Sequence, residues 1–329
     1  AFTDAGEFDI KFRFSGGETV AVPMQLAPLS KREMEVPGIG ESVTVVVSKG
    51  GKEVSREQII FSQQVLRDMP TGGPLPAWLD IRDGKVIMEK DGKKLVSGQD
   101  HTILFRAPTD NDVNLAGIST MAGHTCQEET LTNVQISDQT VTLSWAIRCK
   151  KQEFICTDTY EACSDGILLT SRLHCVKGSG DLPRFGKAFR LEESFQSVQY
   201  LGRNGESYRD MAEHTQIEQV SCAVSDMTEP NIRPQESGNR MDCSWVTVSD
   251  GETFFSFTAV DKPFELGIKP YSDRELLTMS HREDEVTTGT YVTLSAFQMG
   301  IGTGSCGPST RKEYRFDCRQ DYVLKTIIR

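Results

Sequence analysis

The sequence lacks the features that mark several broad classes of protein. Its 36 basic and 47 acidic residues give a net charge of −11, so it has no excess of the basic side chains that nucleic-acid or anionic membrane surfaces require. No apolar run approaches the roughly 20 residues of a membrane-spanning helix. We therefore predict no nucleic-acid partner and no membrane partner.

The first residues, Ala-Phe-Thr-Asp, include neither an initiator methionine nor the basic and apolar segment of a secretion signal. This start predicts a processed or excised piece of a longer protein. It leaves the compartment of the parent protein open.

The cysteines form no Cys-x-x-Cys pair and do not alternate with histidine at metal-binding spacing. Their odd number, in a chain too long to be a disulfide scaffold, predicts free and mostly buried thiols and no metal site. Free thiols favour a cytoplasmic over a periplasmic location for the parent. The nine are Cys126, Cys149, Cys156, Cys163, Cys175, Cys222, Cys243, Cys306 and Cys318.

Alternation of apolar and polar residues with a period of two is the main structural signal, and no convincing long amphipathic helix is present. In residues 140–149, for example, every second side chain is apolar, as in a strand with one buried face. The composition predicts an all-β chain built as a twisted antiparallel sandwich. Strands are expected at residues 8–14, 20–26, 31–36, 42–48, 102–106, 140–149, 167–176, 246–259, 291–299 and 321–328.

Residues 68–76, Asp-Met-Pro-Thr-Gly-Gly-Pro-Leu-Pro, cannot sustain a regular helix or strand and predict a linker. The expected domains are residues 1–72 and 76–329. Too few strands precede the linker for the seven of an immunoglobulin-like sandwich. We therefore expect that domain to be incomplete at its N-terminus, with its first strands upstream of residue 1.

The most informative stretch is Arg106-Ala-Pro-Thr-Asp-Asn-Asp112. Pro108 cannot donate to a β-ladder and should end the strand before it. Asp110, Asn111 and Asp112 can bond nearby backbone N–H groups, so chemistry alone favours a simple Asx-type turn at a strand end.

This heptad resembles the signature that opens the large C-terminal β-sandwich of family 2 β-galactosidases. Three further segments resemble that family in its own order: residues 200–210, residues 234–240 with Trp245, and residues 298–302 running into 305–308. The resemblance covers about residues 76–329. It implies an incomplete immunoglobulin-like β-sandwich followed by a large antiparallel β-supersandwich of galactose-mutarotase-like type.

The resemblance also implies a function for the chain. Such a domain supports the upstream catalytic barrel of the same enzyme and lends one wall to its galactoside pocket, while both catalytic glutamates lie on the barrel. No catalytic residue is therefore expected here, and Mg and Na would be bound by the missing barrel, with no cofactor on this chain. The parent enzyme is expected to be a homo-oligomer.

The residues expected to line the sugar pocket are those at the positions that match the pocket residues of the family. In well-known members a tryptophan stands where this sequence has Cys306, which puts the stacking contact with sugar in doubt. The wall residues predicted by the resemblance are Asp110, Asn111, Asp112, Asn114, Ser305 and Cys306.

Three alternatives remain open. The chain could be a stand-alone carbohydrate-binding module, the small subunit of a two-chain β-galactosidase, or a mutarotase-type sugar epimerase working with histidine and a carboxylate. His174 falls on the polar face of its expected strand, which counts against the epimerase. Glu192-Glu193 is expected to be a solvated strand end.

Overall fold

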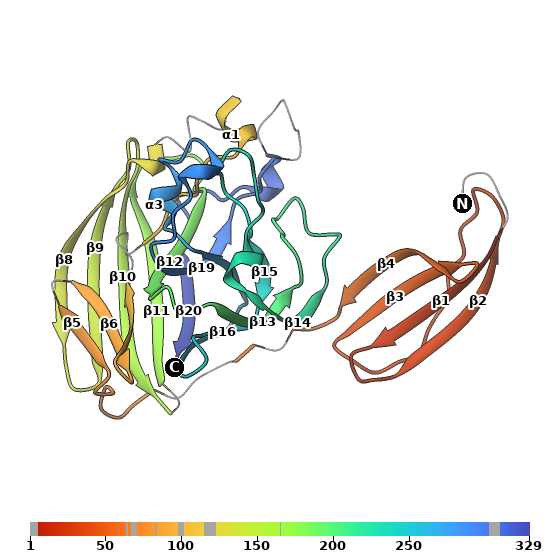
Figure 1. The fold of residues 1–329 in the computed structure, drawn as a ribbon, viewed down its shortest axis with the longest axis horizontal. Helices are drawn as coiled ribbons and strands as arrows, with labels where there is room; N and C mark the ends of the chain where they lie inside the picture. Colours follow the sequence, from red (N-terminus) through yellow and green to blue (C-terminus); the bar gives the residue numbers. More distant parts are fainter. Residues whose placement is uncertain are drawn as a thin grey trace. The chain divides into compact units, whose positions relative to one another are not determined.

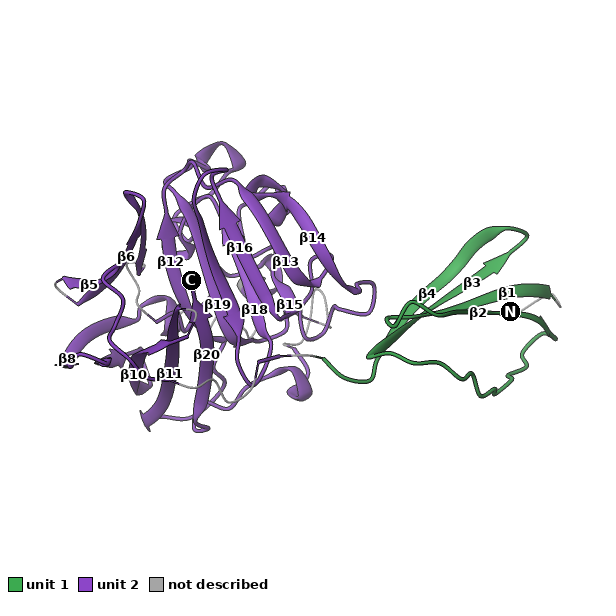
Figure 2. Ribbon diagram, turned by 90° about the horizontal axis from the view of Figure 1, so that it is seen from below, with its two compact units in different colours: residues 1–64 green, residues 65–329 purple. Residues whose placement is uncertain are grey.

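The chain divides into two compact units, coloured separately in Figure 2: Ala1–Gln64 and Val65–Arg329. The structure is a computed structural model that describes residues 6–63, 65–66, 71–82, 84–97, 102–114, 123–164, 166–302 and 310–329. Each unit is considered by itself.

The first unit is a sheet of four antiparallel strands in the order β2-β1-β3-β4 (Figure 1). The turn Lys49-Gly-Gly-Lys52 joins β3 to β4, as its glycines predicted, and both glycines have positive φ. The strand expected at residues 31–36 is wrong. The residues alternate as in a strand, but no neighbouring strand bonds to them, and they form an irregular, mostly exposed segment. The strands are β1 Gly6–Phe14, β2 Thr19–Leu26, β3 Ser42–Lys49 and β4 Lys52–Ile60.

The second unit contains an antiparallel sheet of nine strands in the order β14-β13-β16-β17-β20-β11-β10-β9-β8. Its strands cover most of those expected from alternation. They are β8 Glu128–Ile136, β9 Thr140–Arg148, β10 Glu153–Cys163, β11 Gly166–Lys177, β13 Ser197–Arg203, β14 Ile217–Ala223, β16 Trp245–Ser249, β17 Phe254–Ala259 and β20 Tyr322–Ile328.

A second sheet of seven strands has the order β15-β18-β19-β12-β7-β6-β5. Figure 1 shows β12 and β19 side by side within it. The strands are β5 Leu79–Arg82, β6 Lys85–Lys90, β7 Lys93–Ser97, β12 Arg184–Leu191, β15 Arg240–Cys243, β18 Phe264–Lys269 and β19 Thr290–Gln298.

One hydrophobic core joins the two sheets. It combines side chains of the nine-stranded sheet, such as Leu169 and Phe257, with side chains of the seven-stranded sheet, such as Phe189 and Leu294. The rings of Phe189 and Phe257 lie 5.2 Å apart across this layer. The prediction of an all-β chain with a large antiparallel sandwich is therefore confirmed.

Helices among the described residues are short: α1 Asp110–Asn114, a helical turn at residues 123–125, α3 Asp273–Leu276 and the 3-10 turns Val224–Met227, Arg282–Asp284 and Lys312–Tyr314. None of the helices in the described ranges is long and apolar enough to cross a bilayer.

Two local expectations around the heptad are corrected. Residues 102–106 do not form a strand, because only Ile103 pairs, in a single bridge to Gly186. Asp110, Asn111 and Asp112 begin the helix α1 instead of an Asx-type turn. Residues 102–106 form no ladder because the backbone N–H groups of Thr102 and Leu104 donate to side chains instead, to Glu129 at 2.9 Å and to Gln127 at 3.0 Å.

Candidate functional site

The heptad is held together by a buried ion pair between its first and last residues. Arg106 is fully buried, and its Nη1 lies 3.1 Å from Oδ2 of Asp112. Nη2 of Arg106 donates to Oδ1 of Asp112 at 3.3 Å and to the carbonyl of Gly300 at 3.2 Å. The carboxylate of Asp112 also accepts from the backbone N–H and the hydroxyl of Thr109, at 2.8 and 3.0 Å. Asp112 therefore serves to shape the start of α1.

The other two polar residues of the heptad reach segments far away in the sequence. Asp110 is exposed, and its backbone N–H donates to Oε1 of Gln235 at 2.8 Å, while Nε2 of Gln235 donates to its carboxylate at 3.2 Å. Nδ2 of Asn111 donates to the carbonyl of Ile301 at 3.4 Å. The heptad thus contacts both the 234–240 and the 298–302 segments.

The carboxylate of Asp210 binds the backbone of residues 298–302, which we call the glycine-rich segment. Its two oxygens accept the backbone N–H groups of Ile301 and Gly302, at 3.0 and 2.9 Å. We call this arrangement the clamp. Gly302 has a φ of +120°, which favours glycine, and Gly300 is packed so closely that a Cβ would lie 2.6 Å from the carboxyl carbon of Asp210.

Gly300→Ala is therefore expected to force Asp210 away from the two N–H groups and to lower the free energy of unfolding by about 1–3 kcal/mol. Gly267→Ala is the matched control, because its Cβ would meet only Thr293, at 3.9 Å. Urea unfolding followed by tryptophan fluorescence measures both. Equal stability of the two variants would show that the clamp is not formed.

Behind the clamp lies a buried ion cluster of two cations and two anions: Arg184, Lys269, Glu236 and Asp273. Arg184 donates to Glu236 at 3.1 Å and to Asp273 at 2.7 Å. Lys269 donates to the same carboxylates at 2.6 and 2.7 Å. All four side chains are at most 7% exposed, so they form a closed square of charges in the protein interior.

The electrostatics of the buried ion cluster keep both carboxylates ionised. Burial opposes their ionisation, but the charges of Lys269 and Arg184 outweigh it and hold the pKa values of Glu236 and Asp273 below their ordinary range. Gln298 also donates to Glu236, at 3.0 Å, which connects the cluster to the glycine-rich segment.

Two other carboxyl groups, Glu206 in the second matching segment and Glu265 on β18, have pKa values shifted in the opposite direction. Burial raises the pKa of Glu206 and the pKa of Glu265 above the ordinary value. Glu206 accepts from the N–H of Gly238 at 2.8 Å, and Glu265 accepts from Arg209 at 2.9 Å and from Asn239 at 3.0 Å. These bonds join the 200–210 segment to the 234–240 segment.

The structure thus brings together all four segments on which the resemblance was based. Of the predicted wall residues, Asp110, Asn111 and Asp112 lie at this junction. Asn114 belongs to α1, its side chain is not described, and Ser305 and Cys306 lie outside the described residues. Sequence reasoning did not assign Asp210 to the wall. Asp210 is the last residue of the second matching segment, and this position was the signal that could have identified it.

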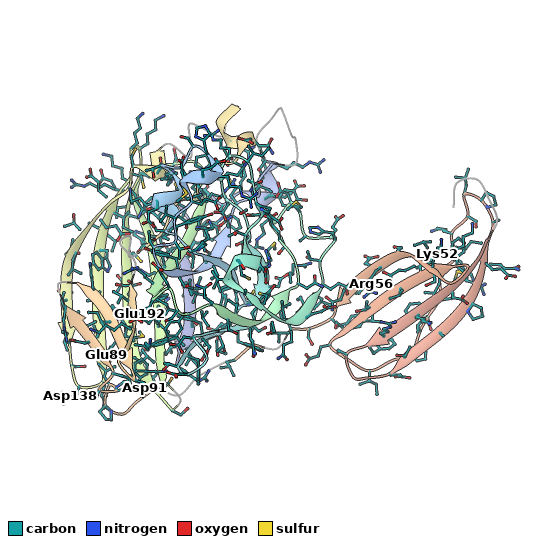
Figure 3. The ribbon with its side chains drawn as sticks, viewed as in Figure 1. Lys52, Arg56, Glu89, Asp91, Asp138 and Glu192 are labelled. Carbon is teal, nitrogen blue, oxygen red and sulfur yellow. The ribbon has the colours of Figure 1, made fainter. Side chains whose placement is uncertain are left out.

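Other candidates of the sequence lie elsewhere. His174 is exposed on β11 and pairs with exposed Asp321 at 2.7 Å. Glu192 and Glu193 are both exposed, as expected of a solvated strand end, and Figure 3 labels Glu192, which accepts from Lys93 at 3.3 Å.

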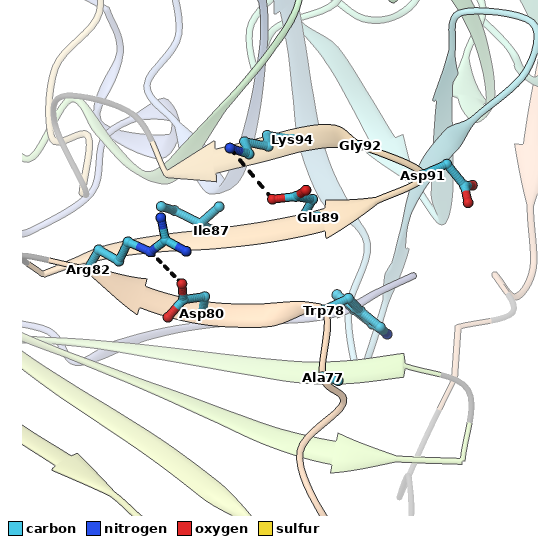
Figure 4. A pocket seen from close by; sticks show the side chains of 9 residues that line it. All are labelled: Ala77, Trp78, Asp80, Arg82, Ile87, Glu89, Asp91, Gly92 and Lys94. Carbon is cyan, nitrogen blue, oxygen red and sulfur yellow. Dashed lines mark hydrogen bonds and ion pairs between the residues drawn. The ribbon is translucent and has the colours of Figure 1, made fainter.

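A hollow of about 320 Å³ lies over β5 and β6, and none of the four matching segments lines it (Figure 4). Four of its five charged side chains pair with each other, because Arg82 lies 2.6 Å from Asp80 and Lys94 lies 3.6 Å from Glu89, and Asp91 is the fifth. We assign it no site.

The described part of the chain contains no group of three or more histidine, cysteine, aspartate or glutamate side chains placed to hold a metal ion. The eight cysteines in this part of the chain have free thiols. Burial raises the pKa of Cys149 and of Cys156 to about 12, so neither is a reactive thiolate at neutral pH.

Comparison with known proteins assigns a family to most of the chain. The β-galactosidase small chain family matches residues 76–328. The β-galactosidase of Staphylococcus xylosus is 26% identical over 81% of this chain and 30% of its own length. That of Streptococcus thermophilus is 25% identical over 98% of this chain and 34% of its own length.

The chain spans about a third of the length of these relatives. Among solved structures, a putative aldose 1-epimerase from Escherichia coli K12 matches 88% of this chain and 96% of its own, at 9% identity and a TM-score of 0.33, which does not establish a shared fold. The family match covers most of the chain and coincides with the segments that meet at the clamp. On this ground the chain belongs to the β-galactosidase small chain family.

Proposed function

We propose that this chain is a non-catalytic portion of a family 2 β-galactosidase. In this proposal the second unit packs against the catalytic barrel and lends one wall, formed around α1 and the clamp, to the pocket for a terminal β-galactoside. The observation that carries the proposal is that Asp112, Asp210 and Glu236 of the matching segments bind backbone N–H groups or buried cations.

A retaining glycosidase needs one carboxylic acid with a raised pKa and a second carboxylate about 5 Å away that is free to attack the sugar. Asp112 and Asp210 bind backbone N–H groups, and Glu236 and Asp273 bind Arg184 and Lys269. Attack by any of the four would break bonds that support the fold. Chemistry on a galactoside is therefore assigned to the barrel.

The barrel would also hold the Mg and Na that the resemblance implies, since the described residues offer no suitable cluster. No step in this proposal depends on these cations. The partners proposed for the chain are the barrel of the same enzyme, further copies of that enzyme, and the galactoside.

The purified chain is expected to fold and to release no measurable nitrophenol from an aryl β-galactoside, because both catalytic carboxylates lie elsewhere. The assay compares the chain with a heat-denatured sample at neutral pH. Turnover that is retained through purification and abolished by a single carboxylate substitution would contradict the proposal.

A second candidate, acid-base chemistry on sugar by this chain itself, is favoured by one observation. The hydroxyl of Tyr208 lies 3.3 Å from Glu206 and 3.5 Å from Glu236, and the pKa is raised for the first carboxyl and lowered for the second. Such a pair can divide the roles of acid and base. This candidate requires that the chain accelerate the interconversion of galactose anomers and that Glu206→Gln abolish the effect. Absence of acceleration would exclude it.

A further inference from the structure

A cleft of about 650 Å³ lies in the second unit beside β20, and its volume is in the range of small-ligand sites. It uses neither α1 nor the clamp residues. We call it the β20 cleft. Its lining comes from β11, β15, β19, β20 and the connection between β17 and β18, together with Arg209 and Phe316.

The β20 cleft exists because the nine-stranded sheet divides at this point. β17 pairs with β20 through Phe257–Ala259, and the last bond runs from Val260 N–H to the carbonyl of Lys325, at 3.2 Å. Asp261 then takes a left-handed φ of +66°, and Lys262 N–H donates to the carbonyl of Val260 at 2.8 Å. This tight turn sends the chain into β18 of the other sheet, so the first half of β20 loses its neighbour on that side.

The open edge presents one backbone donor and one acceptor. In an antiparallel strand, the N–H and C=O of a residue point to the same side, and this side alternates along the strand. Because Lys325 bonds toward β17, Val323 turns its N–H and C=O toward the cleft, where no described strand pairs with it. One such residue is too short an edge for the addition of a peptide strand but suits a single pair of ligand hydrogen bonds.

The interior wall of the β20 cleft is aromatic. Phe316 stacks on Phe297 with ring centroids 3.9 Å apart, and Tyr322 lies 4.4 Å from Phe297. Phe316 and Tyr322 are only half-buried. The guanidinium of Arg209 lies over the Phe316 ring, 5.5 Å from its centroid, so the surface available to a ligand is Tyr322 and the uncovered part of Phe316. Such a wall can cover the C–H face of a sugar ring.

The rim carries charges of both signs. Its three carboxylates are already paired, Asp242 with Arg203 at 2.7 Å, Asp261 with Lys325 at 2.5 Å and Asp321 with His174 at 2.7 Å. Among the described residues, Arg172 and Lys262 on the same rim form no ion pair. Each carboxylate keeps acceptor capacity, and the two cations supply donors.

We propose that the β20 cleft binds a neutral saccharide. Sugar hydroxyls both donate and accept hydrogen bonds, so they match a rim that mixes carboxylates, cations and one backbone N–H and C=O pair. The local charge is nearly balanced, with four cations and three paired carboxylates in the lining, so it selects for no strongly charged ligand. The net charge of −11 opposes the approach of anions at longer range. The aromatic wall supplies the apolar contact that neutral sugars require in water.

The test is ligand-detected saturation-transfer NMR and calorimetry on the full 329-residue chain, with lactose, cellobiose and maltose as probes. At least one is expected to bind with a Kd of about 1 mM. Arg172→Ala combined with Lys262→Ala should weaken that binding about tenfold, because hydrogen bonds from charged donors are lost.

The matched control combines Arg148→Ala with Lys151→Ala, which removes two exposed cations away from the cleft and should leave Kd unchanged. Inorganic phosphate and glucuronate serve as anionic probes. Absence of binding by all three saccharides, equal loss in the control, or tighter binding of the anionic probes would each overturn the proposal. Because binding is measured directly, the result does not depend on whether the chain supports a catalytic barrel.

Discussion

Lys187→Met is expected to destabilise the second unit by about 3–5 kcal/mol, because it leaves a carboxylate buried without its cation. Nζ of Lys187, on β12, lies 2.6 Å from Oδ2 of Asp158, on β10, and the two side chains are 2% and 0% exposed. The pair therefore joins the two sheets through the middle of the core. Lys187 also donates to the hydroxyl of Thr102 at 2.8 Å.

The pKa of Lys187 supports this expectation. Burial disfavours the charge on Lys187, but the neighbouring carboxylate of Asp158 outweighs it and raises the pKa of the lysine. Methionine matches the length of the lysine stem but cannot offset the charge of Asp158. Urea unfolding at neutral pH measures the loss.

Lys325→Met is the matched control for this experiment. Its ammonium lies 2.5 Å from Asp261, but the two side chains are 31% and 42% exposed, so water replaces the lost partner. A cost below about 1 kcal/mol is expected. Similar losses in the two variants would mean that the Lys187 pair is hydrated in solution, contrary to its burial here.

Lys269→Met is expected to cost about 3–5 kcal/mol at neutral pH, and this cost is expected to shrink as the pH falls. The substitution leaves Glu236 and Asp273 to share Arg184 alone, so the buried ion cluster acquires a net negative charge. The effect should spread to the clamp, since Gln298 bonds to Glu236 and leads into the glycine-rich segment.

The direction of the pH effect follows from the lowered pKa values of the two carboxyls. Ionised in the folded state, they contribute stability that is fully present above their ordinary values of 4.5 and 3.8. This contribution is lost as the pH falls through the lower folded-state values. Without Lys269 the folded-state pKa values rise toward or above the ordinary ones, because burial is then opposed by one cation only. The difference in stability between the unaltered chain and the variant is therefore largest at neutral pH and narrows as the pH falls.

The measurement is the free energy of unfolding from pH 8 down to about pH 3 for the unaltered chain, Lys269→Met and the control Lys177→Met. Lys177 pairs with Glu153 at 3.5 Å, and both side chains are substantially exposed, at 74% and 42%. The control should follow the unaltered chain. A Lys269→Met profile parallel to that of the unaltered chain would contradict the coupling within the cluster.

Local sequence patterns predicted strands correctly where a segment has one buried and one solvated face. Residues 140–149 alternate strictly, and β9 buries Val141, Leu143 and Ile147 as that period predicts. The same pattern failed at residues 31–36, where alternation is present but no strand lies beside them. A period of two describes the side chains of a strand and cannot supply its hydrogen-bonding neighbour.

The heptad shows the limit of local chemistry at the site. An Asx-type turn was the simplest use of Asp110, Asn111 and Asp112, because short polar side chains bond nearby backbone. In the fold the partners are Gln235, Ile301 and Arg106. Two of the three lie more than a hundred positions away, and no local pattern predicts them.

The sequence by itself determined the all-β class, the glycine turns and the order of the four matching segments, because each depends on residues that are neighbours along the chain. Only the tertiary structure decided that β12 and β18 bury Arg184, Lys187 and Lys269. In an isolated strand these charges would face water. They are buried because other layers cover both sides of the sheet and bring carboxylates from distant segments within hydrogen-bonding distance.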